Sequence, residues 1–152
     1  MSNKQPIITN CYQCNELAEL NYRSRCKECQ AGFEAAHFKV VVAGGRTFED
    51  YALLEAKLDK LLVERNNLMI ISGAANGADK LGEQYAGHRE YELLRMPANW
   101  ALHGNSAGYR RNVEMAERAD AVVVFWDGKS RGSKHMIDIA KHNNIPTRVI
   151  NY

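Results

Sequence analysis

The sequence predicts an α/β protein with a parallel β-sheet covered by helices on both faces, preceded by a small metal-binding segment. Three observations support this prediction. From residue 38 onward, short apolar stretches alternate with stretches of helical periodicity. Glycine-rich turns follow several of the apolar stretches. All four cysteines lie within the first 29 residues. We therefore expect two domains, residues 1–37 and residues 38–152.

The composition favours an ordinary globular protein. The chain has 152 residues, of which 45% are hydrophobic, and its formal net charge is +2. That balance gives no general attraction to nucleic acid or to membrane surfaces. No apolar run approaches the roughly 18 residues of a membrane span, and the N-terminus lacks the apolar stretch of a signal peptide. We expect a cytoplasmic protein without a membrane partner, whose thiols stay reduced.

The cysteines form two CxxC pairs, Cys11 with Cys14 and Cys26 with Cys29, separated by eleven residues. Two such pairs supply the four sulfur ligands of a structural Zn²⁺ site, and we expect a zinc ribbon in residues 1–37. Disulfides are disfavoured by a reducing compartment. A redox CxxC is disfavoured because no βαβ unit surrounds the pairs. Acidic and basic residues balance in this segment, so a clamp or a dimer element fits it better than a nucleic-acid contact.

The elements of the larger domain follow in strict alternation. Strands are predicted at 38–43, 68–71, 91–96, 121–126 and 147–150. Helices are predicted from a capping sequence at 47–50 to about residue 65, at 78–87, at 107–118, and from Ser133, as N-cap, to about residue 142. A loop joins residue 96 to residue 107. Such alternation indicates a parallel sheet with helices on both faces.

Three glycine-rich loops follow the first, second and fourth predicted strands. They are residues 44–46, 72–79 and 127–133. Ligands of open parallel sheets bind at the carboxyl ends of the strands, and helix N-termini attract phosphate groups. Three such loops at one edge therefore predict a site for an anionic ligand. Neither GxxxxGK[ST] nor a GxGxxG after the first strand is present, which argues against a P-loop and a standard dinucleotide fingerprint.

Several motifs follow one another along the chain: AGGRTF (43–48), SGAANGADKLGEQYA (72–86), PANW (97–100), AGYRRN (107–112) and FWDGKSRGS (125–133). In their sequence and their order, these motifs resemble those of the SLOG superfamily. This superfamily includes the Lonely Guy phosphoribohydrolases, the DNA-processing DprA proteins and YspA-like proteins, and the resemblance is greatest to the YspA-like branch. It implies a Rossmann-like sheet of about five strands in the order 3-2-1-4-5, a homodimer or higher homo-oligomer, and a pocket for nucleotide-derived molecules.

The resemblance also assigns residues to that pocket by motif position. Its floor would be Gly44, Gly45 and Arg46. One wall would be Ser72, Gly73, Asn76, Gly77 and Asp79. The phosphate loop would contain Asp127, Gly132 and Ser133. Arg110 and Asn112 would reach in from the side, from the helix that follows PANW.

The sequence favours a binding protein over an enzyme. The catalytic glutamate of Lonely Guy enzymes aligns with Met136, and a thioether transfers no proton. We expect a sensor or sequestering protein for a nucleotide or ADP-ribose-like molecule, of a kind found in phage or mobile-element genomes. A nucleoside 5'-monophosphate phosphoribohydrolase using Asp79 or Asp127 is the first alternative. A DprA-like DNA-binding protein is the second.

Overall fold

A computed structural model describes residues 8–10, 17–19 and 27–152, and the chain divides into two compact units, Met1–His37 and Phe38–Tyr152. In the first unit, strand β1 (Ile8–Asn10) pairs antiparallel with β2 (Leu17–Glu19), and helix α1 spans Lys27–Ala35. The predicted zinc ligands Cys11, Cys14 and Cys26 lie outside the described residues, whereas Cys29 lies in α1. The zinc site stays a prediction.

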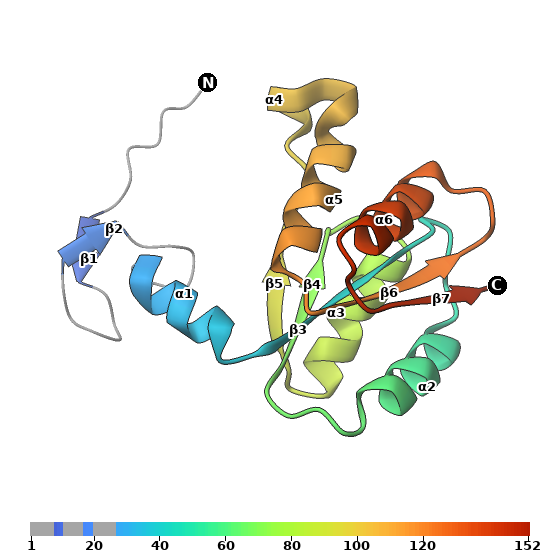
Figure 1. The fold of residues 1–152 in the computed structure, drawn as a ribbon, viewed down its shortest axis with the longest axis horizontal. Helices are drawn as coiled ribbons and strands as arrows, with labels where there is room; N and C mark the ends of the chain where they lie inside the picture. The colour runs from blue at the N-terminus through green and yellow to red at the C-terminus, as the bar shows by residue number, and fades with distance from the viewer. Residues whose placement is uncertain (1–7, 11–16, 20–26) are drawn as a thin grey trace. The chain divides into compact units, whose positions relative to one another are not determined.

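The second unit is a five-stranded sheet with helices between its strands (Figure 1). The strands are β3 (Phe38–Gly44), β4 (Leu68–Ser72), β5 (Glu92–Arg95), β6 (Ala121–Trp126) and β7 (Thr147–Asn151). The main helices are α2 (Tyr51–Leu62), α3 (Ala78–His88), α5 (Ala107–Arg118) and α6 (Arg131–His142). Every neighbouring pair in the order β5-β4-β3-β6-β7 is parallel. This confirms the predicted parallel sheet with flanking helices and its strand order.

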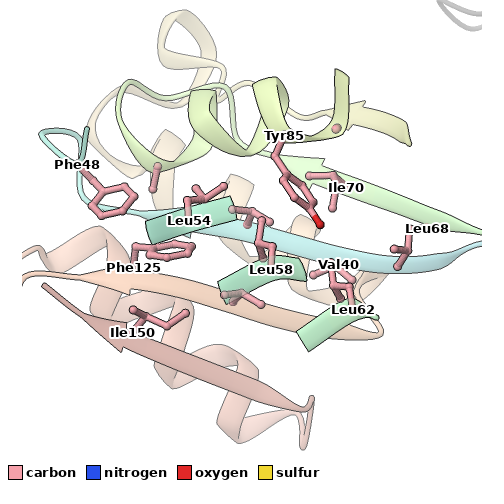
Figure 2. Packing of buried hydrophobic residues seen from close by; sticks show 14 residues of the cluster. Val40, Phe48, Leu54, Leu58, Leu62, Leu68, Ile70, Tyr85, Phe125 and Ile150 are labelled. Carbon is pink, nitrogen blue, oxygen red and sulfur yellow. The ribbon is translucent and has the colours of Figure 1, made fainter. Parts of the chain in front are cut away.

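One face of the sheet packs against α2 and α3 (Figure 2). Alternate residues of β3 and β4 point to this face because successive side chains of a strand point to opposite sides. Leu54 and Leu58 recur one helical turn apart on α2, and both are fully buried. The same cluster contains Val40, Val42, Phe48, Leu62, Leu68, Ile70, Tyr85, Val123, Phe125 and Ile150.

The opposite face of the sheet packs against α5 and α6. The intervening strand residues Val41, Ile71 and Val124 are fully buried there. Met115 of α5 and Met136 of α6 are buried as well, with 0% and 1% of their surface exposed. The chain therefore buries both faces of its sheet, as the near-continuous apolar strands predict. No helix of residues 27–152 combines the length and apolar character needed to cross a bilayer.

Three local predictions need correction. Helix α6 begins at Arg131 and its N-cap is Ser130, whose hydroxyl accepts from the Ser133 amide, so Ser133 lies inside the first turn instead of capping it. Helix α2 is capped by the Asp50 side chain and ends at Leu62. The segment before α5 forms a short helix, α4 (Trp100–His103), and a 3-10 turn, η1 (Gly104–Ser106), because the Asn99 side chain caps the Leu102 amide.

Candidate functional site

A cavity of about 400 Å³ lies where strands β3 and β6 end. In the sheet order, these two strands mark the point at which the chain turns from one half of the sheet to the other, the usual ligand position in such folds. The lining comes from four segments, and its members are Ala43, Gly44, Gly45, Arg46, Thr47, Ala75, Asp79, Trp100, Asn105, Gly108, Tyr109, Arg111, Asn112, Met115, Asp127, Ser130, Gly132, Ser133 and Met136.

The floor of the cavity is the loop between β3 and α2. Gly44 has no room for a side chain, because a Cβ there would overlap the Phe125 carbonyl and lie 2.8 Å from the Ala78 Cβ. The Gly45 amide donates to the Phe125 carbonyl at 3.0 Å, and the Gly45 carbonyl accepts from the Ala78 amide at 3.2 Å. These glycines therefore fix the floor against β6 and the start of α3.

The loop between β4 and α3 is fastened to the same floor. Gly77 has a φ of +79°, a conformation that side chains rarely adopt. A Cβ at Gly77 would also overlap the carbonyl of Gly45. The two loops thus form one close-packed unit. Ser72, at the end of β4, is completely buried, donates to Glu83 at 2.8 Å and accepts from the Ala74 amide.

A buried ion pair stands beside this floor. Arg111 of α5 has its Nη1 4.0 Å from Oδ2 of Asp79, and the two side chains are 12% and 4% exposed. Arg111 also donates to the backbone carbonyl of Gly73, and the Ala75 amide donates to the Asp79 carboxylate at 3.3 Å. A Cβ at Gly73 would occupy the space of the Arg111 guanidinium. The β4–α3 loop therefore positions a cation that lines the cavity.

Burial dominates the electrostatics of this pair. It raises the pKa of Asp79 from 3.8 to about 6, against the opposing effects of Arg111 and the Ala75 amide. Burial also lowers the pKa of Arg111, and the nearby charge of Arg46 lowers it further. A guanidinium stays charged after such a shift. Two positive side chains, Arg46 and Arg111, thus line the same cavity.

The side-chain amide of Asn112 links Arg111 to the start of α6. The Nε of Arg111 donates to Oδ1 of Asn112 at 3.2 Å, and Nδ2 of Asn112 donates to the Gly132 carbonyl at 3.1 Å. Asn112 itself is 5% exposed. The first amides of α6 have no intrahelical acceptors, and the helix dipole makes that end positive. The guanidinium and the helix N-terminus therefore reinforce each other at one side of the cavity.

Asp127 shapes the loop that leads into α6. Its Oδ1 accepts from the backbone amides of Lys129 and Ser130 at 2.9 and 2.8 Å. Those hydrogen bonds to the charged form lower the pKa of Asp127. The carboxylate is thus held ionised and engaged with its own loop, which suits it to accept a hydrogen bond and makes it a poor proton donor.

A second cavity, of about 350 Å³, adjoins the first. The two share Arg46, Ala75, Trp100 and Arg111 in their linings. The smaller cavity is completed by Gly73, Ala74, Asn76, Pro97 and Ala98. Aromatic rings flank the larger one: Trp100 is 51% exposed and Tyr109 is 43% exposed. The Arg46 guanidinium lies 6.0 Å from the centre of the Trp100 ring.

The structure brings together most of the residues assigned to the pocket. Gly44, Gly45, Arg46, Asp79, Asn112, Asp127, Gly132 and Ser133 line the larger cavity, and Gly73 and Asn76 line the smaller one with Arg46. Ser72, Gly77 and Arg110 line neither. Arg110 is exposed and donates to the hydroxyl of Ser106 at 3.2 Å.

The sequence assignment passed over Arg111. This residue lies four positions after Ala107 and four before Met115, both of which are buried on the inner face of α5. Helical spacing alone would therefore have placed Arg111 inward and Arg110 outward. Met136, where the resemblance places a glutamate, lines the larger cavity.

The arrangement suits the binding of an anion next to an aromatic group. Two guanidiniums and a helix N-terminus face a cavity that also contains Trp100 and Tyr109. Among the residues that the structure describes, no group of three or more His, Cys, Asp or Glu side chains is placed to hold a metal ion.

Comparisons with known proteins agree with this fold and its motifs. Residues 38–103 match the model of the YspA, cpYpsA-related SLOG family. The Gene 61 protein of Mycobacterium phage D29 is 33% identical over 121 residues, which cover 75% of this chain and 95% of the phage protein.

Among solved structures, DNA processing protein A (DprA) of Streptococcus pneumoniae superimposes with a TM-score of 0.60 at 18% identity, over 76% of this chain and 51% of that one. DprA of Helicobacter pylori, whose structure concerns single-stranded DNA binding, gives 0.57 at 20% identity, over 78% of this chain and 67% of that one. This chain thus spans about half of the S. pneumoniae protein. Those two likenesses show the fold alone. The match to the family model and the phage relative together show that the chain belongs to the YspA, cpYpsA-related SLOG family.

Proposed function

We propose that this protein binds a small nucleotide or nucleotide-derived molecule at the carboxyl ends of its strands. The observation that carries the proposal is the pair Arg46 and Arg111 lining one cavity at the N-terminus of α6. Charge-assisted hydrogen bonds from guanidiniums and helix amides are the usual means of holding phosphate. The exposed rings of Trp100 and Tyr109 offer a flat surface for a base.

Binding without turnover fits the groups near this cavity better than catalysis does. Met136 supplies no proton, and Asp127 is engaged by two amides of its own loop. A protein that captures a ligand and leaves it intact acts as a sensor or as a sequestering protein. The phage relative is consistent with either role in a phage or mobile-element genome.

The test is a binding panel combined with product analysis. Calorimetry with AMP, ADP and ADP-ribose on the full chain should detect binding, while chromatography of the same mixtures should recover the nucleotide unchanged. Arg46→Ala should weaken binding by about tenfold, since it removes a charge-assisted contact. Arg65→Ala is a suitable control, because Arg65 lies over the Phe38 ring at the other end of β3. Equal affinity of Arg46→Ala and the unmodified chain would place the ligand elsewhere.

A nucleoside monophosphate phosphoribohydrolase is the second candidate, and Asp79 favours it. A carboxyl group that lines a cavity and has a pKa of about 6 can serve as a general acid near neutral pH. Such an enzyme would release free base from AMP, and Asp79→Asn would abolish the release. Base release that persists in Asp79→Asn would exclude this role for the residue.

Single-stranded DNA binding is the third candidate, and the H. pylori protein of similar fold motivates it. DNA binding through phosphate contacts would weaken steeply with salt. Gel shifts with a single-stranded oligonucleotide at low and moderate salt would detect it. A shift that Arg46→Ala and Arg111→Lys both reduce would move the proposal from a small ligand to DNA.

We further propose that Cys11, Cys14, Cys26 and Cys29 bind one structural Zn²⁺ and that the protein forms a homodimer or a higher homo-oligomer. The spacing of the cysteines supports the first statement and the family resemblance supports the second. Light scattering of the purified chain measures the oligomeric state, and a monomer at all concentrations would exclude the second.

A further inference from the structure

The side chain of Tyr152 reaches the floor of the larger cavity from across β6. Strand β7, which ends at Asn151, lies beside β6 in the sheet (Figure 1). The Tyr152 amide donates to the Trp126 carbonyl at 3.4 Å, so the backbone of Tyr152 stays at the end of β6. Its hydroxyl nevertheless lies against Gly45, which follows β3, because a Cβ at Gly45 would overlap that hydroxyl. The side chain therefore crosses the end of β6 to reach the loop between β3 and α2.

A buried aromatic pair holds the ring of Tyr152. Ile150 belongs to the core on the α2 and α3 side of the sheet, and Tyr152, two residues later, continues on the same side. Its ring centre lies 4.7 Å from that of Phe48. Phe48 in turn stacks on Phe125, with 4.9 Å between the ring centres (Figure 2). The packing of the ring thus directs the hydroxyl toward the loop that begins at Gly45.

The hydroxyl meets a tight turn that carries Arg46. The Phe48 amide donates to the Gly45 carbonyl at 3.3 Å and closes this turn. Burial raises the pKa of Tyr152, and a side-chain hydrogen bond with Thr47 opposes that effect. Gly45, Arg46 and Thr47 all line the larger cavity. One hydroxyl therefore contacts the turn on both sides of Arg46.

The position of the Arg46 guanidinium depends on this turn. The ion pairs found in the described part of the chain do not include Arg46, and its guanidinium lies 6.0 Å from the centre of the Trp100 ring. A long side chain without an ion-pair partner keeps much of its rotamer freedom, so its backbone determines where it can reach. The Ala78 amide holds the Gly45 carbonyl at 3.2 Å on one side of the turn, and Tyr152 lies on another.

We propose that Tyr152 is a positioning residue of the binding site, whose hydroxyl holds the turn of residues 45–48 and thereby keeps Arg46 at the cavity. Tyr152 itself lines neither cavity, so its effect on a ligand passes through the turn. The inference rests on the proposed binding function. It adds a residue that lies outside all the motifs that resemble the SLOG superfamily.

A double-mutant cycle tests whether Tyr152 acts through Arg46. Calorimetry with AMP, ADP and ADP-ribose is carried out on the full chain, on Tyr152→Phe, on Arg46→Ala and on the double variant. Tyr152→Phe keeps the ring and removes the hydroxyl, so affinity should fall by about fivefold. In the Arg46→Ala background the same change should alter affinity by less than about twofold, since the turn then carries no guanidinium. Equal losses in both backgrounds, or no loss in Tyr152→Phe, would overturn the inference.

The matched control is Asn151→Ala. Asn151 is exposed and precedes Tyr152, and its side chain points to the opposite face of the sheet. Its replacement should leave nucleotide affinity within about twofold of the unmodified chain. A loss as large as that of Tyr152→Phe would show that the end of β7 as a whole is needed, and it would exclude a specific role of the hydroxyl.

Gly45→Ala supplies an independent variant. The three atoms nearest to the added Cβ all belong to Tyr152, whose side chain can rotate away toward solvent, so this substitution should displace the hydroxyl from the turn. Nucleotide affinity should fall as it does in Tyr152→Phe. The two substitutions together should cost no more than Gly45→Ala alone, because both remove the same contact. Additive losses would contradict the inference.

Hydrogen exchange followed by NMR tests the contact without any ligand. The Gly45 amide donates to the Phe125 carbonyl and the Phe48 amide to the Gly45 carbonyl, so their exchange reports on opening of the turn. Tyr152→Phe should speed the exchange of both amides by about fivefold and leave that of Ile70, in β4, unchanged. Unchanged exchange at the turn, or the same acceleration at Ile70, would overturn the inference.

The two kinds of measurement separate this inference from the proposed function. Absence of nucleotide binding to the unmodified, folded chain would overturn the proposed function and the ligand-related part of the inference. The exchange rates would still decide whether Tyr152 holds the turn. Nucleotide binding that is unaffected by Tyr152→Phe would overturn the inference alone.

Discussion

The carboxylate of Asp79 and the guanidinium of Arg111 lie 4.0 Å apart, and both side chains are largely withdrawn from solvent. Neither group is satisfied by the other alone. The Ala75 amide donates to Asp79, and Arg111 donates to the Gly73 carbonyl and to Asn112. The pair therefore joins the β4–α3 loop to α5 at the lining of the cavity.

The pH dependence of stability should reveal the burial of Asp79. Its pKa is raised from 3.8 to about 6, so the folded chain holds this proton more tightly than the unfolded chain does. Stability then falls as the pH rises from about 4 to about 6. Relative to Asp79→Asn, which does not titrate, the unmodified chain should lose about 3 kcal/mol of unfolding free energy over this window. Urea unfolding of both proteins at several pH values measures the difference, and a difference independent of pH would contradict it.

A pair of neighbouring arginines offers a matched test of the cavity. Arg111→Lys keeps the charge but loses the planar group that contacts Gly73 and Asn112 together, so nucleotide affinity should fall by about tenfold. Arg110→Lys changes an exposed side chain that contacts Ser106 and should leave the affinity within about twofold. Calorimetry measures the nucleotide affinity of both variants. Equal affinities of the two variants would show that the planar guanidinium of Arg111 does not hold the ligand.

A methyl group at Gly73 should displace Arg111 without removing it. The Cβ of Gly73→Ala would overlap the guanidinium and lie 2.7 Å from Oδ2 of Asp79, so the arginine must move. We expect a loss of about 1–3 kcal/mol of stability and about tenfold in nucleotide affinity. Gly87→Ala is the control, because a Cβ at this position of α3 meets no atom within 4 Å and favours the helix. Unchanged affinity in Gly73→Ala would separate Arg111 from ligand binding.

Metal analysis of the purified chain should find about one zinc per molecule, as expected for a site with four thiolate ligands. Cys11→Ser combined with Cys26→Ser should release it, since each CxxC pair then loses one sulfur. Ser24→Ala, a substitution in the same segment that spares the thiols, should retain the metal. Mass spectrometry of the metal content provides the measurement, and zinc at the same level in the double variant would refute the assignment.

The sequence predicted the sheet well because its signals are local. Each strand is a short apolar run bounded by glycine, proline or polar residues, and the fold follows from their alternation with helices. The first residues of the helices were harder to predict from the sequence. Ser130 and Ser133 both lie at the beginning of α6, and the choice of Ser130 as N-cap depends on the path of the turn after Asp127. That path is set by the hydrogen bonds that the Lys129 and Ser130 amides donate to the Asp127 side chain, which the two serines themselves do not specify.

The candidate site was predicted in part. The glycine loops were recognised as a site, but the sequence did not say that several of the glycines are required for packing of backbone on backbone, as at Gly44 and Gly77. Helical spacing indicates that Arg111 faces inward, but the sequence assignment chose the neighbouring Arg110, which has the same chemistry. The second cavity depends on how the segment 97–100 folds back beside Arg46, which is a long-range feature.

The close contact between Gly45 and Gly77 has a consequence for how the proposed binding site can change by substitution. A Cβ at Gly77 would overlap the carbonyl of Gly45, and a Cβ at Gly45 would overlap the hydroxyl of Tyr152, so a substitution at either glycine must displace another part of the chain. The wall contributed by Ala98, Trp100 and Tyr109 carries no such constraint, since these side chains are half-buried or exposed. Substitutions in residues 97–109 can thus change the selectivity of the proposed site while the glycines of the floor stay constant. These residues are therefore the segment to randomise when a new ligand is sought.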